Sequence, residues 1–226
     1  MEYAAPRPIP AGIDVQGYLQ RVFAWMLAGL AVTGAVAAAI GSSDSLLTDV
    51  TENPVILIVL MLVGLGIVVA LSAAIDHISP PVAITLFLVY SAINGVLFSF
   101  IFELYTSESI FTTFLICSAM FGALAAYGYL TKTDLTRLGP ILFMALIGLI
   151  LATIVNLFVA NEALYWVTTY AGVAIFAGLT AYDMQKLKEY GEGGGTGDRT
   201  GIRGALALYL DFINLFLYLL RIFGRR

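Results

Sequence analysis

Residues Ala205–Phe223, which read ALALYLDFINLFLYLLRIF, decide the fold of this chain. The stretch carries only two charged residues, Asp211 and Arg221, and is long enough to cross the ~30 Å hydrocarbon core of a bilayer as a helix. It lacks the period-two pattern of a strand, and a single segment in lipid must satisfy its backbone hydrogen bonds internally. It therefore predicts a transmembrane helix with a carboxylate about two turns from its start.

Six further apolar stretches precede it. They are Val22–Gly41, Val55–Ala74, Val82–Phe102, Ile110–Leu130, Leu138–Val159 and Ala163–Tyr182. The whole chain of 226 residues is 60% hydrophobic and 12% charged, against roughly 45–50% and about 25% in ordinary soluble domains. We therefore predict an all-α integral membrane protein with seven transmembrane helices. Residues 1–21 would form a tail, 22–223 one membrane domain and 224–226 a second tail, and the glycine-rich segment 183–204 would be a flexible tether.

The distribution of basic residues predicts the orientation. With a cytoplasmic N-terminus, one side of the membrane receives Arg7, Arg21, Lys132, Arg137, Lys186, Lys188, Arg199 and Arg203, whereas the opposite loops before the last span contain no Lys or Arg. The N-terminal segment lacks the pattern of a cleavable signal peptide. We expect a multi-pass membrane protein with its N-terminus in the cytoplasm, and the short tails and compact loops indicate a bacterial inner membrane.

Composition also excludes several classes of function. A net charge of −4 removes the electrostatic basis for binding nucleic acid. One cysteine, Cys117, and one histidine, His77, leave no intrachain disulfide and no thiolate or histidine metal site. We expect neither a cofactor nor a metal site nor an enzymatic activity.

Two acids are the candidates for function. A carboxylate at the position of Asp211 costs roughly 2.5–3.5 kcal/mol to insert unless the fold compensates it, so its helical face should point into the bundle. Asp183 ends the sixth predicted span on the side from which the seventh begins, so the two carboxylates can approach each other. An interacting pair takes up its protons in two steps that belong to the pair, which makes it a candidate pH sensor.

Other polar residues could line a path beside these acids. Asn214 and Tyr218 share the helical face of Asp211, and Asn94 and Asn156 lie within the third and fifth spans. Each could equally form a hydrogen bond between helices. Small residues at four-residue spacing, including Gly66, Gly122 and Gly178, predict close helix contacts.

Two motifs resemble the Bax inhibitor-1 family, also called transmembrane Bax inhibitor motif proteins. They are Gly178–Lys186, which reads GLTAYDMQK, and Leu208–Phe216, which reads LYLDFINLF. The similarity extends through Ile78–Pro80, Tyr90–Ala92, Phe121–Gly122 and Gly128–Leu135, and so covers nearly the whole chain.

The resemblance implies a central C-terminal helix wrapped by the other six, and a pH-sensitive leak for calcium or other cations. It also implies that Asp183 and Asp211 form the sensing pair, and that Arg221 latches the closed state with Glu52 as its acidic partner. Characterised bacterial members can carry an arginine in the second helix that reaches the pair, whereas Val55–Ala74 contains no basic residue. The expected partners are cations, protons and the lipid bilayer; the sequence indicates no particular membrane-protein partner.

Two alternatives stay open. A proton-coupled transporter also uses intramembrane acids. An intramembrane aspartyl protease would pair Tyr182-Asp183 with a second aspartate, but the glycines expected around that aspartate are absent at Leu208–Asp211, and the chain has no Pro-Ala-Leu tripeptide.

Overall fold

A computed structural model describes residues 14–194 and 197–225, and every regular element in these ranges is a helix. Seven helices are long and apolar enough to cross a membrane, with α5 continuing the span of α4, so the predicted fold class is confirmed. The long helices are α1 (Val15–Gly41), α3 (Pro54–Ala73), α4 (Pro80–Phe98), α6 (Ser107–Leu130), α7 (Leu138–Val159), α8 (Glu162–Glu192) and α9 (Asp198–Phe223). The short ones are α2 (Asp44–Thr51), η1 (Ile75–His77) and α5 (Ile101–Leu104).

Polar side chains just before four long helices define where those helices begin. The side chains of Asp14, Asn53, Thr106 and Asn161 accept hydrogen bonds from free backbone N–H groups in the first turns of α1, α3, α6 and α8. Because Asp14 caps α1, this helix begins seven residues before the predicted span. The rest of the predicted N-terminal tail lies outside the described residues.

The predicted tether at 183–204 is wrong, because most of that segment is helical. Helix α8 continues to Glu192 and α9 begins at Asp198, so the linker between them is only five residues long. Contacts to other helices hold the end of α8: the Lys188 ammonium donates to the Tyr129 carbonyl at 3.0 Å, and the Tyr190 ring lies 6.3 Å from that of Tyr18. Glycine content misled the prediction because tertiary contacts compensate for its low helix propensity.

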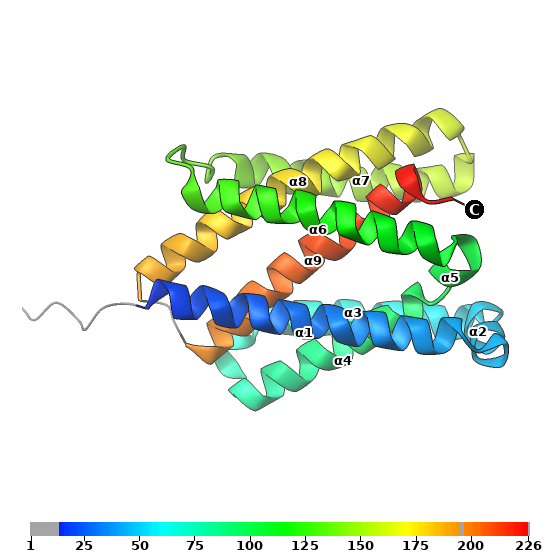
Figure 1. Cartoon of the computed structure of the whole chain (residues 1–226), viewed down its shortest axis with the longest axis horizontal. Coiled ribbons are helices and arrows are strands. Elements are labelled where there is room, and N and C mark those ends of the chain that lie inside the picture. The colour runs from blue at the N-terminus through cyan, green and yellow to red at the C-terminus, as the bar shows by residue number, and fades with distance from the viewer. Residues whose placement is uncertain (1–13, 195–196, 226) are drawn as a thin grey trace, which may run out of the picture.

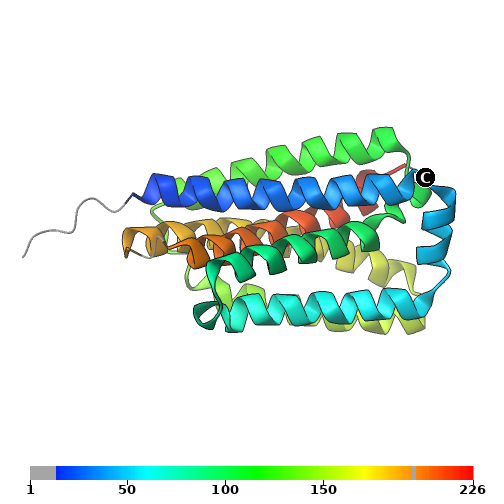
Figure 2. The ribbon, with the colours of Figure 1, turned by 90° about the horizontal axis from the view of Figure 1, so that it is seen from below.

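Helix α9 runs obliquely through the middle of the bundle (Figures 1 and 2). Its principal helix contacts are with α1, α4, α6 and α8. Over the most apolar 18 residues of each span, 56% of the residues in α9 are buried, against 17% in α3 and 6% in α7. Helices α3 and α7 pack mainly on α4 and α8, so the wrapping of α9 by all six other spans stays a prediction.

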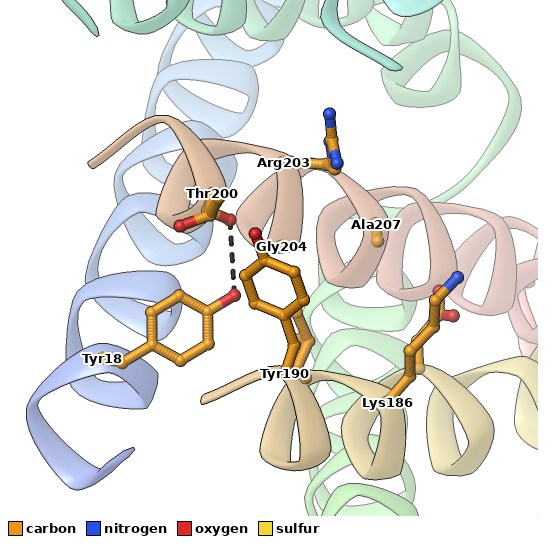
Figure 3. A pocket seen from close by; sticks show the side chains of 9 residues that line it. Tyr18, Lys186, Tyr190, Thr200, Arg203, Gly204 and Ala207 are labelled. Atoms are coloured by element: carbon orange, nitrogen blue, oxygen red, sulfur yellow. Dashed lines mark hydrogen bonds between the residues drawn. The ribbon is translucent and has the colours of Figure 1, made fainter. Parts of the chain in front are cut away.

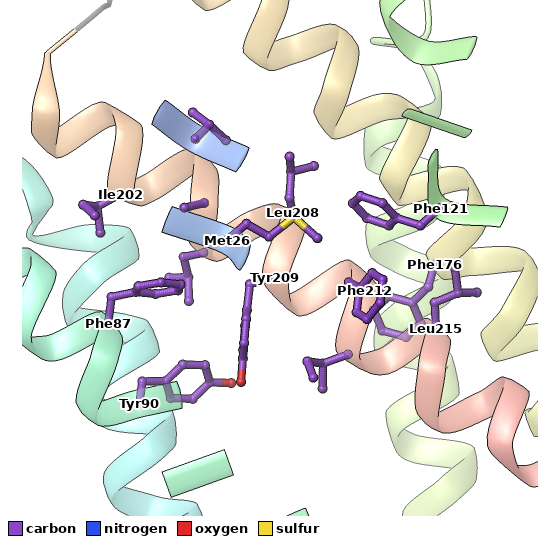
Figure 4. Close-up of a cluster of buried hydrophobic side chains, with 14 of the residues drawn as sticks. Met26, Phe87, Tyr90, Phe121, Phe176, Ile202, Leu208, Tyr209, Phe212 and Leu215 are labelled. Atoms are coloured by element: carbon purple, nitrogen blue, oxygen red, sulfur yellow. The ribbon is translucent and has the colours of Figure 1, made fainter. Parts of the chain in front are cut away.

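Aromatic side chains of α9 form the centre of the core (Figure 4). The Tyr209 ring packs edge-on against Phe87 and Tyr90 of α4, with centroids 5.6 and 5.9 Å apart. One turn further, the Phe212 ring meets Phe121 of α6 at 5.4 Å. Such edge-to-face contacts add to the packing energy of the buried rings. These ring contacts attach α9 both to α4 and to α6.

A buried hydroxyl relay joins α9 to α1 and α4. The Tyr209 hydroxyl lies 2.7 Å from Thr33 Oγ1, which has the carbonyls of Ser91 and Gly29 within 2.9 and 3.0 Å. The Thr33 hydroxyl has a single proton, which it donates to one of these two carbonyls. We therefore infer that the Tyr209 hydroxyl donates to Thr33. These hydrogen bonds satisfy the buried hydroxyl groups of Thr33 and Tyr209.

Helix contacts follow the predicted small-residue spacing only in part. A Cβ built on Gly66 or on Gly122 would meet nothing within 4 Å, so these two glycines are not contact positions. A Cβ on Gly128 would come within 2.2 Å of the Ala181 carbonyl oxygen, which marks the close approach of α6 and α8. The prediction holds at Gly178, where a Cβ would lie 2.9 Å from Leu142.

We expect Gly128→Ala to destabilise the protein by about 1–3 kcal/mol, because the new methyl group must push α6 away from the α8 backbone. Gly122→Ala is the matched control in the same helix and should leave stability unchanged or slightly higher. Thermal unfolding in detergent measures both. Equal unfolding temperatures for the two variants would contradict the close approach.

We expect Tyr209→Phe to cost about 0.6–1 kcal/mol of unfolding free energy, because it removes one buried hydrogen bond and keeps the ring. The control is Tyr127→Phe, since the Tyr127 side chain is exposed and should not contribute. The same unfolding assay applies, and a loss shared equally by both variants would count against the relay.

Candidate functional site

A cavity of about 1020 Å³ lies between α3, α4, α7, α8 and α9, and we call it the central cavity. Its wall is largely apolar, with polar side chains concentrated on α8 and α9. The polar residues that line it are Ser72, Tyr90, Asn94, Tyr182, Asp183, Lys186, Arg203, Asp211, Asn214 and Tyr218. Both predicted acids therefore border one space.

The central cavity extends along α9 from one end of the bundle. We call this end, where α8 ends and α9 begins, the basic end. The lining residues of α9 run from Arg203 to Tyr218, a rise of about 22 Å, and those of α3 from Met61 to Ser72, a rise of about 16 Å. These lengths are about half to three-quarters of a ~30 Å hydrocarbon core. The cavity thus reaches deep into the bundle.

Asp211 lies in the middle of α9, thirteen residues after its first residue. The prediction placed it about two turns inside the span, and the difference arises because α9 begins seven residues before Ala205. Its side chain is 4% exposed, and its Oδ2 atom has no hydrogen-bond partner among the described residues. An unpaired carboxylate oxygen in an apolar interior costs several kcal/mol of desolvation. Such a group requires a proton, water or a cation in the cavity.

Asp183 lies on α8, nine residues before the end of that helix, and not at a helix terminus as predicted. It lines the same cavity, half-buried, together with Asp211 and Lys186. The packing of α8 along α9 brings the two aspartates onto one cavity.

A glutamine that the sequence analysis did not single out holds this part of α8 in place. Gln185 is buried and forms two hydrogen bonds with the loop between α6 and α7: its Oε1 accepts from the Leu135 N–H at 2.8 Å, and its Nε2 donates to the Thr133 carbonyl at 2.9 Å. Because Gln185 is two residues from Asp183, this clamp fixes the position of the aspartate. In the sequence, the only indication of this role was that a polar residue lies two positions after a candidate acid.

Three of the four predicted path residues line the central cavity. They are Asn94, whose Nδ2 is buried without a partner among the described residues, Asn214, whose Nδ2 donates to the Leu210 carbonyl at 2.8 Å, and Tyr218. Asn156 does not line it. Its Oδ1 accepts from the Asn161 N–H at 2.9 Å, so this side chain shapes the turn between α7 and α8.

Aromatic rings occupy the far end of the cavity. The Tyr218 ring stacks on Phe176 with centroids 5.9 Å apart, and a Cβ on Gly172 would come within 2.6 Å of it. The Arg221 guanidinium lies over the rings of Tyr218 and Tyr165, at 5.0 and 5.6 Å. We call these residues the aromatic seal.

The structure does not bring the predicted latch residues together. Among the described residues the ion pairs are Arg21–Asp198, at 3.7 Å, and Arg203–Asp76, at 3.0 Å; none joins Arg221 to Glu52. Glu52 is exposed and follows α2, whereas Arg221 has aromatic partners. Cation–π contact provides an arginine near the end of a span with a partner that requires no second charge.

A smaller cavity of about 240 Å³ adjoins the central cavity at the basic end (Figure 3). Lys186 of α8 and Arg203 of α9 line both spaces, as does Asp183. Arg203 Nη2 donates to Asp76 at 3.0 Å, while its Nε atom is buried without a partner in the described part of the chain. From the sequence, Arg203 indicated only the orientation in the membrane, because its position on the cavity depends on the helical start of α9.

The acids do not form a ready-made metal centre. No group of three or more His, Cys, Asp or Glu residues within 14–194 and 197–225 is arranged to hold a metal ion. A pair of carboxylates with nearby amides and hydroxyls is better suited to protons and to weakly held, partly hydrated cations than to a resident metal.

Comparison with known proteins supports the family resemblance seen in Gly178–Lys186 and Leu208–Phe216. A family model described as "Inhibitor of apoptosis-promoting Bax1" matches residues 15–226. The chain is 49% identical to "Inner membrane protein YbhL" of Escherichia coli K12, over 94% of this chain and 93% of that protein. It is also 40% identical to a protein of Borreliella burgdorferi, over 92% of both chains, and 39% identical to one of Deinococcus radiodurans, over 94% and 92%. The chain is thus a multi-pass membrane protein that belongs to the Bax inhibitor-1 family, among its bacterial members.

Proposed function

We propose that the protein is a pH-sensitive leak channel for calcium or other cations, with Asp183 and Asp211 as sensor and gate. The observation that carries the proposal is the position of both carboxylates on one deep cavity, with an Asp211 oxygen that no described residue satisfies. Negative groups there would attract cations into the cavity.

The gate would act through the separation of α8 and α9. Two ionised carboxylates repel each other, whereas a pair that shares one proton forms a hydrogen bond. Because α8 and α9 pack on each other and both line the central cavity, a change in that separation alters the shape of the cavity. Protonation would in this way control the width of the path.

Conduction also requires an opening at the aromatic seal. Tyr218 is the lining residue farthest along α9 from the basic end, and its ring packs tightly between Gly172 and Phe176. We propose that the stacking of Arg221 on Tyr165 and Tyr218 holds this seal closed, in place of the predicted pairing with Glu52.

We propose that the basic end faces the cytoplasm of a bacterial cell. The excess of Lys and Arg at that end follows the positive-inside rule, and the Escherichia coli relative is named an inner membrane protein. Cations would then pass between the periplasmic side and the cytoplasm, down their gradient.

A proton-coupled transporter is the second candidate, and the volume of the central cavity favours it. About 1020 Å³ lies just above the ~300–1000 Å³ typical of sites for small molecules. A transporter differs from a leak because its uptake of one solute saturates and moves protons with it. Uptake in proteoliposomes without a calcium leak would favour this reading over the channel. We propose transport rather than peptide cleavage, since paired carboxylates alone do not define a reaction.

We expect Asp183→Asn and Asp211→Asn each to abolish the pH dependence of calcium flux into proteoliposomes across about pH 5–8, the range in which perturbed carboxylates titrate. Each variant removes one member of the pair and keeps its size. Fluorescence of a trapped calcium indicator measures the flux. Wild-type pH dependence in either variant would overturn the sensor.

Asp134→Asn is the matched control for this assay. Asp134 is exposed between α6 and α7, and the Thr136 hydroxyl and N–H, which both donate to its carboxylate, lower the pKa of Asp134. A carboxyl with a lowered pKa stays ionised throughout the assay range and loses its charge only in stronger acid. We therefore expect the pH dependence of wild type.

The seal leads to a separate expectation. Tyr165→Leu should increase calcium flux severalfold, because it removes one of the two rings under Arg221, whereas Glu52→Gln should leave flux unchanged. Flux at one fixed pH in matched proteoliposomes compares them. An increase with Glu52→Gln and none with Tyr165→Leu would instead favour the acidic latch.

A further inference from the structure

The central cavity opens sideways between α3 and α7. Met61 and Leu65 of α3 and Phe143 and Ile150 of α7 all line it, yet their side chains are 51–61% exposed. Residues that border a cavity and also lie on the outer surface form the rim of an opening. Because these helices cross the membrane, the opening faces the acyl chains of the bilayer.

Positive charge surrounds the basic end of this opening. Lys186 and Arg203 line the cavity there, and the Arg199 guanidinium donates to the Asp76 carbonyl at 2.9 Å beside Arg203. The acids that face the same region are Asp76, which is paired with Arg203, and Asp183. Asp211 lines the same cavity about 12 Å further along α9. The ion pairs among the described residues do not involve Lys186, so its ammonium is available to an anion at this end.

We propose that an anionic phospholipid inserts one acyl chain through the opening between α3 and α7, with its headgroup phosphate at Lys186 and Arg203. The inference concerns occupancy of the cavity and does not rest on cation conduction.

Both ends of such a lipid match the surface they would meet. An apolar wall without contacts forfeits dispersion energy, which a neighbouring acyl chain restores at no cost in hydration. Basic pockets between transmembrane helices at the cytoplasmic surface favour anionic headgroups, by about fivefold in affinity per cation. The acyl chain would run along the apolar wall of α3 and α7, opposite the polar face of α9.

Quenching of a buried tryptophan by brominated acyl chains tests the proposal. In full-length protein with Trp25 and Trp166 replaced by Phe, Phe176→Trp places the probe on the cavity wall. Phe121→Trp is the matched control, because Phe121 is also 5% exposed but lies in the core against Phe212. In vesicles of brominated phosphatidylglycerol we expect clearly stronger quenching for Phe176→Trp. Equal quenching of the two probes would overturn the proposal.

The headgroup is tested by the choice of lipid. Brominated phosphatidylglycerol, diluted into unbrominated phosphatidylcholine, should quench Phe176→Trp at about fivefold lower concentration than brominated phosphatidylcholine does. Lys186→Gln should remove most of this preference. If the two lipids quenched Phe176→Trp at equal concentrations with Lys186 in place, the proposal of an anionic headgroup would be wrong.

Native mass spectrometry provides a measurement on the unaltered chain. Wild type released from mixed micelles should retain phosphatidylglycerol over phosphatidylcholine, and Gly64→Leu, which places a side chain in the cavity, should retain less of it. Retention unchanged by Gly64→Leu would place the lipid elsewhere and overturn the proposal. Neither the quenching assay nor the mass spectrometry uses a calcium gradient. A failed flux experiment would therefore not count against the lipid proposal.

Discussion

The desolvation of one carboxylate, that of Asp211, governs the architecture around it. An ionisable group in the middle of a transmembrane helix is costly to bury, so the fold must provide it with a polar surrounding. Here the helix that carries it is the most buried of the seven spans, and the adjoining cavity is lined by Asp183, Asn94 and Asn214. Burial of α9 and the polar face of the central cavity are two consequences of the same constraint.

The rest of the bundle divides into parts that hold α9 and parts that leave room beside it. The Tyr209 hydroxyl relay, its ring contacts with α4 and the contact of Phe212 with α6 immobilise one side of the helix. On the other side α3 and α7 stand away from α9, and the central cavity lies between them. A rigid side next to an unfilled one is a suitable arrangement for a path whose width depends on small helix movements.

The two proposals would make the bilayer part of this site. The central cavity opens between α3 and α7 and reaches the basic end, so its polar wall would be available to ions and its apolar wall to lipid. The two proposals therefore concern different walls of one space. An acyl chain along α3 and α7 would narrow the route past the aspartates, so the lipid composition of the membrane would act on the same cavity as the proton.

The sequence alone determined the seven spans, the excess of basic residues at one end and the two acids, because hydropathy and charge belong to each residue wherever it packs. It misplaced the tether, Gly66, Gly122, Asn156 and the partner of Arg221. Two of these depend on neighbours distant in sequence: Tyr18 and Tyr129 hold the end of α8, and Tyr165 lies under Arg221. Asn156 instead accepts from the nearby Asn161 N–H, and a Cβ on Gly66 or Gly122 would meet nothing within 4 Å. Only the tertiary structure decided these contacts and the central cavity, since empty space arises from how helices pack and leaves no local signal in any one of them.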